Sequence, residues 1–178
     1  PQATPVSGKE PLTVAFTGSN STDSDGTVAG YLWDFGDLTS TSTAANPGHV
    51  YTSAGNYIAT LTVTDDDGAQ NTATIAITVN ANQPPNAVAG ANKLTGKEPL
   101  AVNFSSGGSS DPDGTIVGYS WNFGDGSAAS TSANPSHTFA AFGSYDVTLT
   151  VTDDNGVTDS DSLTITVNAN QAPVAVAN

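Results

Sequence analysis

The amino-acid sequence predicts an all-β protein that consists of two tandem β-sandwiches. Three observations support this prediction. The sequence repeats itself at a distance of 88 residues, apolar residues alternate with polar ones in short runs, and no segment carries a sustained 3.6-residue apolar pattern. The composition agrees, because Thr, Ser, Asn, Asp and Gly are abundant while Leu, Lys, Glu and Met are scarce or absent.

The repeat covers nearly the whole chain. A shift of 88 residues aligns residues 8–83 with residues 96–171 without a gap, and 41 of the 76 aligned positions are identical. We therefore predict a first sandwich at residues 1–81, a second at residues 82–170, and a tail or the start of a third repeat at residues 171–178.

The segment that opens the second copy returns near the C-terminus. Its sequence is Gln83-Pro84-Pro85-Asn86-Ala87-Val88, and the later version is Gln171-Ala172-Pro173-Val174-Ala175-Val176. The repeat would place a third version ahead of Pro1. We therefore expect the first copy to lack the start of its first strand, and the chain to be an excerpt from a longer array.

Period-2 patterns mark the strands of each copy. In the first copy the alternating apolar residues are Leu12, Val14 and Phe16; Tyr31, Trp33 and Phe35; Tyr57, Ala59, Leu61 and Val63; and Ala73, Ile75, Ile77 and Val79. Turn-forming residues separate these runs. A Trp on a middle strand and a Tyr that opens the penultimate strand are features of Ig-like sandwiches. The chain enters and leaves such a sandwich at opposite ends, so we expect the two copies to be arranged end to end.

Several motifs resemble those of the PKD (polycystic kidney disease) domain. They are Tyr31-x-Trp33-Asp34-Phe35-Gly36-Asp37, Asn46-Pro-x-His49-x-Tyr51, Gly55-x-Tyr57 and Val63-Thr64-Asp65-Asp66-x-Gly68, each with a counterpart 88 residues later. Leu38 stands where the family usually has Gly, and Asn122 stands where the first copy has Asp34. The resemblance implies a seven-strand Ig-like sandwich in secreted or cell-surface multidomain proteins. There such modules serve as spacers, adhesion modules or accessory domains of proteases, chitinases and other degradative enzymes.

The charge of the chain restricts its partners. It carries 17 acidic residues against 3 basic ones, for a net charge of −14. Such a surface repels phosphate backbones and anionic lipids, so we expect no nucleic-acid binding and no membrane insertion. Cysteine is absent, which excludes disulfides and thiolate chemistry.

The sequence gives little support to catalysis. The only histidines, His49 and His137, occupy equivalent positions just before a strand, and no nucleophile motif accompanies them. The paired carboxylates lie in Asp-Gly turns without an apolar cleft that would raise a pKa. We predict a structural role for both histidines and no enzymatic activity.

Aromatic residues could instead bind a polymer. Most of them share the phase of inward-facing strand positions, which predicts that Trp33 and Trp121 are buried. Phe142 alone lacks an aromatic counterpart, because Ala54 occupies that place in the first copy. We expect Phe142 to fill a gap at the end of a sheet.

Acidic turns suggest a calcium site. Asp-x-Asp-Gly precedes the Trp strand and Asp-Asp follows the Tyr strand, and Ig topology brings these two loops to the end where the chain enters. Carboxylate and amide oxygens gathered there suit Ca²⁺. The alternative is that these residues merely form Asx-type turns. The predicted ligands are Asn82, Gln83, Asp111, Asp113, Asp153 and Asp154 for the second copy, and Asp23, Asp25, Asp65 and Asp66 for the first. The resemblance adds that some bacterial PKD-like domains hold calcium in a similar way.

We therefore predict a non-catalytic spacer or adhesion module of a secreted or cell-surface protein, with Ca²⁺ stiffening the geometry between its domains. Its partners would be the neighbouring domains of a longer chain. The alternative is an accessory module that binds an insoluble polymer, such as chitin, collagen or another polysaccharide, beside the catalytic domain of a degradative enzyme.

Overall fold

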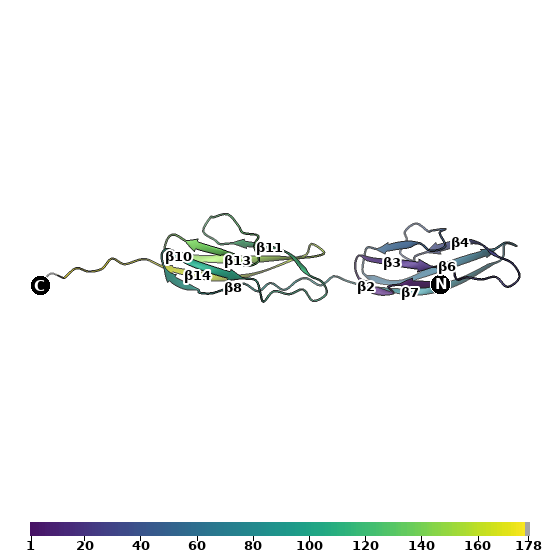
Figure 1. The fold of residues 1–178 in the computed structure, drawn as a ribbon, viewed down its shortest axis with the longest axis horizontal. Helices are drawn as coiled ribbons and strands as arrows, with labels where there is room; N and C mark the ends of the chain where they lie inside the picture. Colours follow the sequence, from purple (N-terminus) through teal and green to yellow (C-terminus); the bar gives the residue numbers. More distant parts are fainter. Residues whose placement is uncertain (177–178) are drawn as a thin grey trace. The chain divides into compact units, whose positions relative to one another are not determined.

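The computed structural model describes residues 1–176, which form two separate folded units (Figure 1). Unit 1 comprises Pro1–Asn82, and unit 2 begins at Gln83. All regular secondary structure in residues 1–176 is β-strand, which confirms the all-β prediction. None of these residues belongs to a helix long and apolar enough to cross a membrane.

Each unit contains seven strands, as predicted. The strands of unit 1 are β1 (Gln2–Thr4), β2 (Ser7–Lys9), β3 (Leu12–Thr17), β4 (Val28–Asp34), β5 (Gly48–Tyr51), β6 (Gly55–Asp65) and β7 (Gln70–Asn80). The strands of unit 2 are β8 (Gly90–Ala91), β9 (Thr95–Lys97), β10 (Leu100–Ser105), β11 (Ile116–Asn122), β12 (Ser136–Phe139), β13 (Gly143–Asp153) and β14 (Thr158–Asn168).

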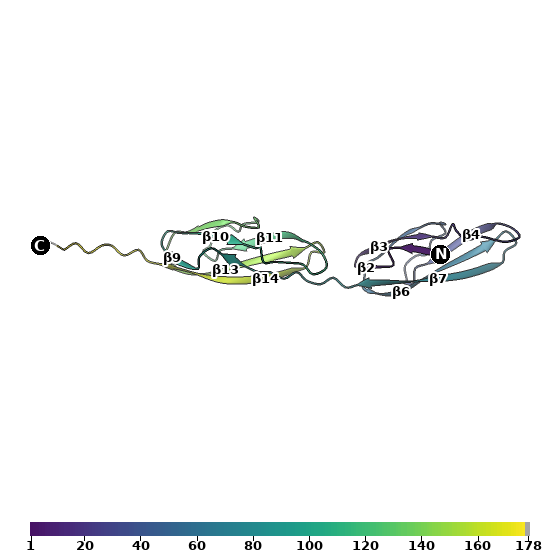
Figure 2. The ribbon, with the colours of Figure 1, turned by 60° about the horizontal axis from the view of Figure 1, so that its bottom comes forward.

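Two sheets form each sandwich, and the topology is the same in both units (Figure 2). In unit 1 the sheets have the strand orders β1-β3-β5 and β2-β7-β6-β4, and in unit 2 the orders are β8-β10-β12 and β9-β14-β13-β11. The first two strands of a unit belong to different sheets, so the chain crosses between the layers soon after it enters. β2 runs parallel to β7 and β9 parallel to β14, whereas all other pairs are antiparallel.

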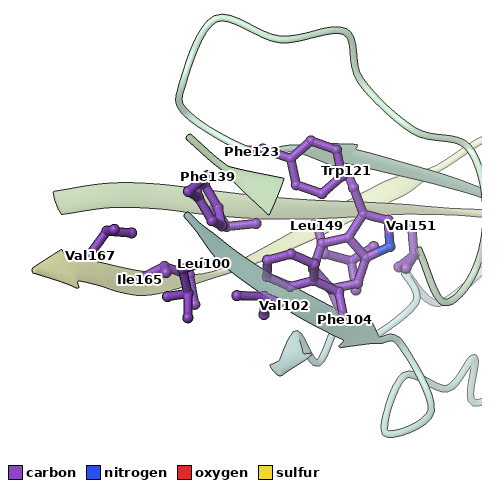
Figure 3. Packing of buried hydrophobic residues seen from close by; sticks show 12 residues of the cluster. Leu100, Val102, Phe104, Trp121, Phe123, Phe139, Leu149, Val151, Ile165 and Val167 are labelled. Carbon is purple, nitrogen blue, oxygen red and sulfur yellow. The ribbon is translucent and has the colours of Figure 1, made fainter. Parts of the chain in front are cut away.

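A tryptophan occupies the centre of each core. Trp33 and Trp121 are both 0% exposed, which confirms their predicted burial. Figure 3 shows Trp121 among Phe104, Leu149 and Val151, and its ring centroid lies 5.2 Å from that of Phe104. Because these side chains come from both sheets, they join the two layers.

The turn after the Trp strand depends on glycine. Gly36 has a φ of 77°, and a Cβ atom there would lie 2.5 Å from the carbonyl oxygen of Ile58. Two residues later, Leu38 keeps a φ of 65° where its counterpart Gly126 has 80°. The departure from the usual Gly therefore leaves the turn intact, at a conformational cost of about 1–2 kcal/mol.

Replacing Trp33 by Ala is expected to lower the free energy of unfolding of unit 1 by ~3–5 kcal/mol, because the substitution leaves a cavity between the sheets. Domains of this size have total stabilities of only ~5–15 kcal/mol. Urea unfolding of the wild type and of W33A measures the difference. The matched control is Val117→Ala at an exposed position, which should change stability by no more than about 0.5 kcal/mol. A comparable loss in both variants would contradict this account of the core.

Candidate functional site

The acidic turns of unit 2 meet the entering chain, as the Ig topology predicts. The backbone N–H of Gln83 donates to both carboxylate oxygens of Asp113, at 3.3 and 3.2 Å. The N–H of Asp113 donates to Asp111 Oδ1 at 3.3 Å, and the N–H of Thr115 donates to Asp154 Oδ1 at 3.4 Å. The first acidic turn thus contacts both the second turn and the residue at which the unit begins.

Turn formation uses one oxygen of Asp153. This residue is 1% exposed, and its Oδ1 accepts the N–H groups of Asn155 at 2.9 Å and Val157 at 2.7 Å. Asp65 does the same in unit 1, for the N–H groups of residues 67 and 69. The Asx-type turns weighed against a metal site are therefore present at these two residues, and they occupy one carboxylate oxygen of each.

Asp111 presents a different environment. Its Oδ2 atom is buried and has no hydrogen-bond partner among the described residues. A buried carboxylate oxygen without a partner is costly, and a bound cation would offset that cost. This atom fits the predicted metal site better than any other in the turn.

Carboxylates alone do not complete a metal site. Within residues 1–176, no group of three or more His, Asp or Glu side chains is gathered closely enough to hold a metal ion. The remaining ligands would have to be amide or backbone carbonyl oxygens, which Ca²⁺ accepts readily. Of the predicted amide ligands, Gln83 contacts Asp113 through its backbone, whereas Asn82 belongs to unit 1.

In unit 1, two of the four predicted carboxylates lie together. A Cβ atom on Gly26 would lie 2.7 Å from Asp23 Oδ2 and closer still to Asp66 Oδ1, so both side chains gather around that glycine. The N–H of Thr27 donates to Asp66 Oδ1 at 2.8 Å, and this hydrogen bond lowers the pKa of Asp66. Asp25 is exposed.

The residues that fix the exit of the chain were not predicted. Glu10 Oε1 accepts the N–H of Asn82 at 3.2 Å, and Glu98 Oε1 accepts the N–H of Asn170 at 3.1 Å. The second oxygen of each glutamate accepts an N–H from the loop before β6 or β13. The signal was available, because these are the only two glutamates in the sequence and they occupy equivalent positions.

Two further carboxylates hold the entering segment of unit 2. Asp159 Oδ2 accepts the N–H of Ala87, and Asp161 Oδ2 accepts the N–H of Ala89, both at 2.8 Å. The repeat did not single out these residues, because unit 1 has Asn71 and Ala73 in their places.

The chain enters and leaves unit 2 at opposite ends. Ala87 lies beside Asp159, near the start of β14, and the exit clamp of Glu98 lies beside the last residue of that strand, Asn168. Nine residues of strand separate the two points, which corresponds to about 30 Å.

Both histidines have structural partners. His137 Nε2 lies 2.7 Å from Asp125 Oδ2, and its ring stacks on that of Phe123 with centroids 4.0 Å apart. His49 repeats this arrangement with Asp37 and the ring of residue 35. Each pair ties the turn after the Trp strand to the next strand, in agreement with the predicted structural role.

The prediction for Phe142 is wrong. Its side chain is 65% exposed and fills no gap at the end of the sheet. The N–H of Phe142 donates to Glu98 Oε2 at 2.7 Å, which anchors the backbone of this loop as Glu10 anchors that of Ala54 in unit 1.

The sequence profile of the PKD domain matches residues 1–79 and again residues 82–167. The chain belongs to the PKD domain family. PKD domains are non-catalytic modules, so the family places no active site within these residues.

Relatives of this PKD tandem include a microbial collagenase of Vibrio alginolyticus, 44% identical over 92 residues. The pre-pro-metalloprotease PrtV of Vibrio cholerae serotype O1 (strain M66-2) is 39% identical over 140 residues. These matches cover 52% and 78% of this chain but span only 11% and 14% of the relatives. Among solved structures, the PKD1 domain of Vibrio anguillarum Epp matches with 36% identity and a TM-score of 0.44, over 50% of this chain and 99% of that domain.

The Asp125–His137 pair predicts a loss of stability in acid. Burial alone would raise the pKa of Asp125, but hydrogen bonds from Ser127 and His137 outweigh it and hold that pKa at about 2. Since an unfolded Asp titrates near ~3.9, the stabilisation is complete above about pH 4 and is lost as the pH falls through about 2. Asp125→Asn should therefore flatten the pH dependence of unfolding between about pH 4 and 2. Urea unfolding across this range tests the prediction, with exposed Asp67→Asn as the control. An unchanged slope in D125N would refute it.

Proposed function

We propose that the chain is a stiff spacer in a secreted or cell-surface multidomain protein, and that Ca²⁺ reinforces its junction. The observation that carries this proposal is a pair of hydrogen bonds to the backbone of the two residues at the unit boundary. Glu10 of unit 1 binds the N–H of Asn82, and Asp113 of unit 2 binds the N–H of Gln83. Because these are consecutive residues, no unrestrained residue remains between the two units.

Further features of the segment support stiffness. Pro84 and Pro85 follow directly, and proline restricts both its own φ and the residue before it. The chain enters unit 2 beside Asp159 and leaves it beside Asn168, at opposite ends of β14. This separation suits a module that adds its length to a chain of modules.

Calcium is the second part of the proposal. The buried Asp111 Oδ2, the neighbouring carboxylate of Asp113 and the turn that starts at Asp153 supply hard oxygen donors at the boundary. Gln83 and Asp154 are the other donors within unit 2, and the participation of Asn82 stays a prediction. Bound Ca²⁺ would neutralise part of the acidic charge there and draw these groups together.

The role of Glu10 can be tested with Glu98, the equivalent residue of unit 2, as the control. Glu10→Ala should widen the distribution of distances between the units, because the last residue of unit 1 loses its anchor. Single-molecule energy transfer between dyes on Ala76→Cys and Ala128→Cys measures that distribution, since the chain has no native cysteine. Glu98→Ala is the matched control, because it removes the same clamp where no described unit follows. Equal distributions in E10A and the wild type would contradict the proposed role.

Calcium binding should be measurable in chelator-stripped protein. We expect calorimetric titration to show uptake, and Ca²⁺ to raise the Tm of unit 2 by linkage to the folded state. Asp111→Asn should weaken binding by at least about tenfold through loss of a charged ligand. Asp146→Asn, a carboxylate bonded to Thr164 elsewhere in unit 2, should leave binding unchanged. No uptake at millimolar Ca²⁺ would exclude the site.

Polymer binding is the alternative function, and it is favoured by the presence of collagenases among the relatives. The surface gives it less support, because both tryptophans are buried and Phe142 is the one exposed aromatic side chain within residues 1–176. Pull-down on insoluble collagen and chitin, with and without chelator, tests it. We expect no retention. Retention that Phe142→Ala abolishes would establish the polymer-binding role instead.

A further inference from the structure

In unit 1, a continuous row of ring contacts leads from the buried tryptophan to a half-buried tyrosine. Neighbouring ring centroids in this row are 3.9–5.3 Å apart, the usual range for packed aromatic side chains. The rings belong, in order, to Trp33, Phe16, Phe35, His49, Tyr51 and Tyr57. Trp33 and Tyr51 are both 0% exposed, whereas Tyr57 is half-buried. The row therefore connects the centre of the core with the surface.

Unit 2 repeats this row with one difference. Its rings belong, in order, to Trp121, Phe104, Phe123, His137, Phe139 and Tyr145, and neighbouring centroids are 4.0–5.5 Å apart. Figure 3 shows the tryptophan and the three phenylalanines of this row. Phe139 takes the place of Tyr51, so the two rows differ in a single hydroxyl group at this position.

Tryptophan and tyrosine are the side chains of this sequence that lose one electron most readily. Cysteine and methionine, which oxidants in general attack first, are absent from it. A tryptophan radical cation takes an electron from tyrosine, because the phenol releases its proton and the resulting phenoxyl radical is the more stable species. Phenylalanine is oxidised far less easily, so its ring can lie between donor and acceptor but cannot hold the radical.

The surroundings of the rings in unit 1 favour transfer away from Trp33. Its Nε1 atom is buried and has no hydrogen-bond partner within residues 1–176, so an oxidised Trp33 keeps its N–H proton and remains a strong oxidant. Tyr51 donates its hydroxyl to Phe35 O at 3.0 Å, and burial raises the pKa of Tyr51 to about 12. Tyr57 donates to Ser53 O at 2.7 Å and is half-buried, so its proton can pass to water. The stable end point of the transfer is therefore Tyr57.

We propose that this row of rings is a relay that carries oxidising equivalents from Trp33 to Tyr57, and so spares the tryptophan on which the core of unit 1 depends. First, a one-electron oxidant such as a carbonate radical takes an electron from Trp33 and is reduced. Tyr51 returns an electron to Trp33, and Tyr57 then returns one to Tyr51 and releases its phenolic proton to water. One oxidant is reduced, one proton is released, and one phenoxyl radical remains at Tyr57.

Unit 2 is expected to be the weaker relay. Transfer from Trp121 to Tyr145 must cross Phe139, which cannot hold the radical on the way. Tyr31 and Tyr119, the tyrosines on the two Trp strands, occupy equivalent positions and compete equally for the radical in both units. A difference between the two tryptophans therefore reports the contribution of Tyr51.

Photo-oxidation with a residue-specific readout tests the relay. Ultraviolet light absorbed by tryptophan, with a cobalt(III) ammine complex as the electron acceptor, oxidises both tryptophans of the intact chain. Peptide mass spectrometry then gives the yield of oxidation products at each Trp and Tyr. We expect less product at Trp33 than at Trp121, and more at Tyr57 than at Tyr145. Equal protection of the two tryptophans in the wild type would contradict the proposal.

Exchange of the two differing residues provides matched variants, because each side chain already occupies the equivalent position in the other unit. Tyr51→Phe should raise the yield at Trp33 to the level of Trp121 and lower it at Tyr57. Phe139→Tyr should have the reverse effect in unit 2. Circular dichroism checks that each variant is folded, and the two variants test the relay independently. Yields at Trp33 that Y51F leaves unchanged, or at Trp121 that F139Y leaves unchanged, overturn the proposal.

Discussion

The burial of one tryptophan between two small sheets is the interaction on which each unit depends. The sequence has no cysteine, so no disulfide joins the layers, and the core alone must do so. Trp33 and Trp121 contact side chains from both sheets and are fully buried. Because the sheets are held in this way, the loops at their ends have fixed positions, and the acidic turns and exit clamps can act on the chain that enters and leaves.

The two units share one framework but differ in the residues beside the entering chain. In both, a glutamate after β2 or β9 holds the departing chain, and a histidine–carboxylate pair fixes the turn after the Trp strand. They differ in the strand that contacts the entering chain. In unit 2, Asp159 and Asp161 of β14 accept N–H groups of that segment, whereas β7 of unit 1 has Asn71 and Ala73 at the equivalent positions. The two modules of this PKD tandem therefore share their framework and differ in the side chains that contact the entering chain.

Much of the fold could be predicted from the sequence, because alternation with period two and a gapless repeat are local signals. The inward phase of Trp33 and the meeting of the acidic turns both followed from them. The repeat marked Glu10 as equivalent to Glu98 but could not name its partner, because a side chain that accepts a backbone N–H places no demand on the residue type of that partner. Asp159 was not marked, since unit 1 has Asn71 in its place. For Phe142, the sequence could not distinguish an exposed ring from one that fills a gap, because the position has no aromatic counterpart in the first copy. For Asp153, the sequence could not tell that one carboxylate oxygen accepts hydrogen bonds from the backbone of the turn.

The proposed spacer function requires that the two modules move as one body, and the anchoring of the consecutive residues Asn82 and Gln83 supports that proposal. The most direct test is ¹⁵N NMR relaxation of the intact wild-type chain with Ca²⁺ present, which reports the rotational diffusion of each unit separately. The account predicts a single, strongly anisotropic diffusion tensor that fits the amides of both units. Two independent and nearly isotropic correlation times, each appropriate to a module of half the mass, would contradict it.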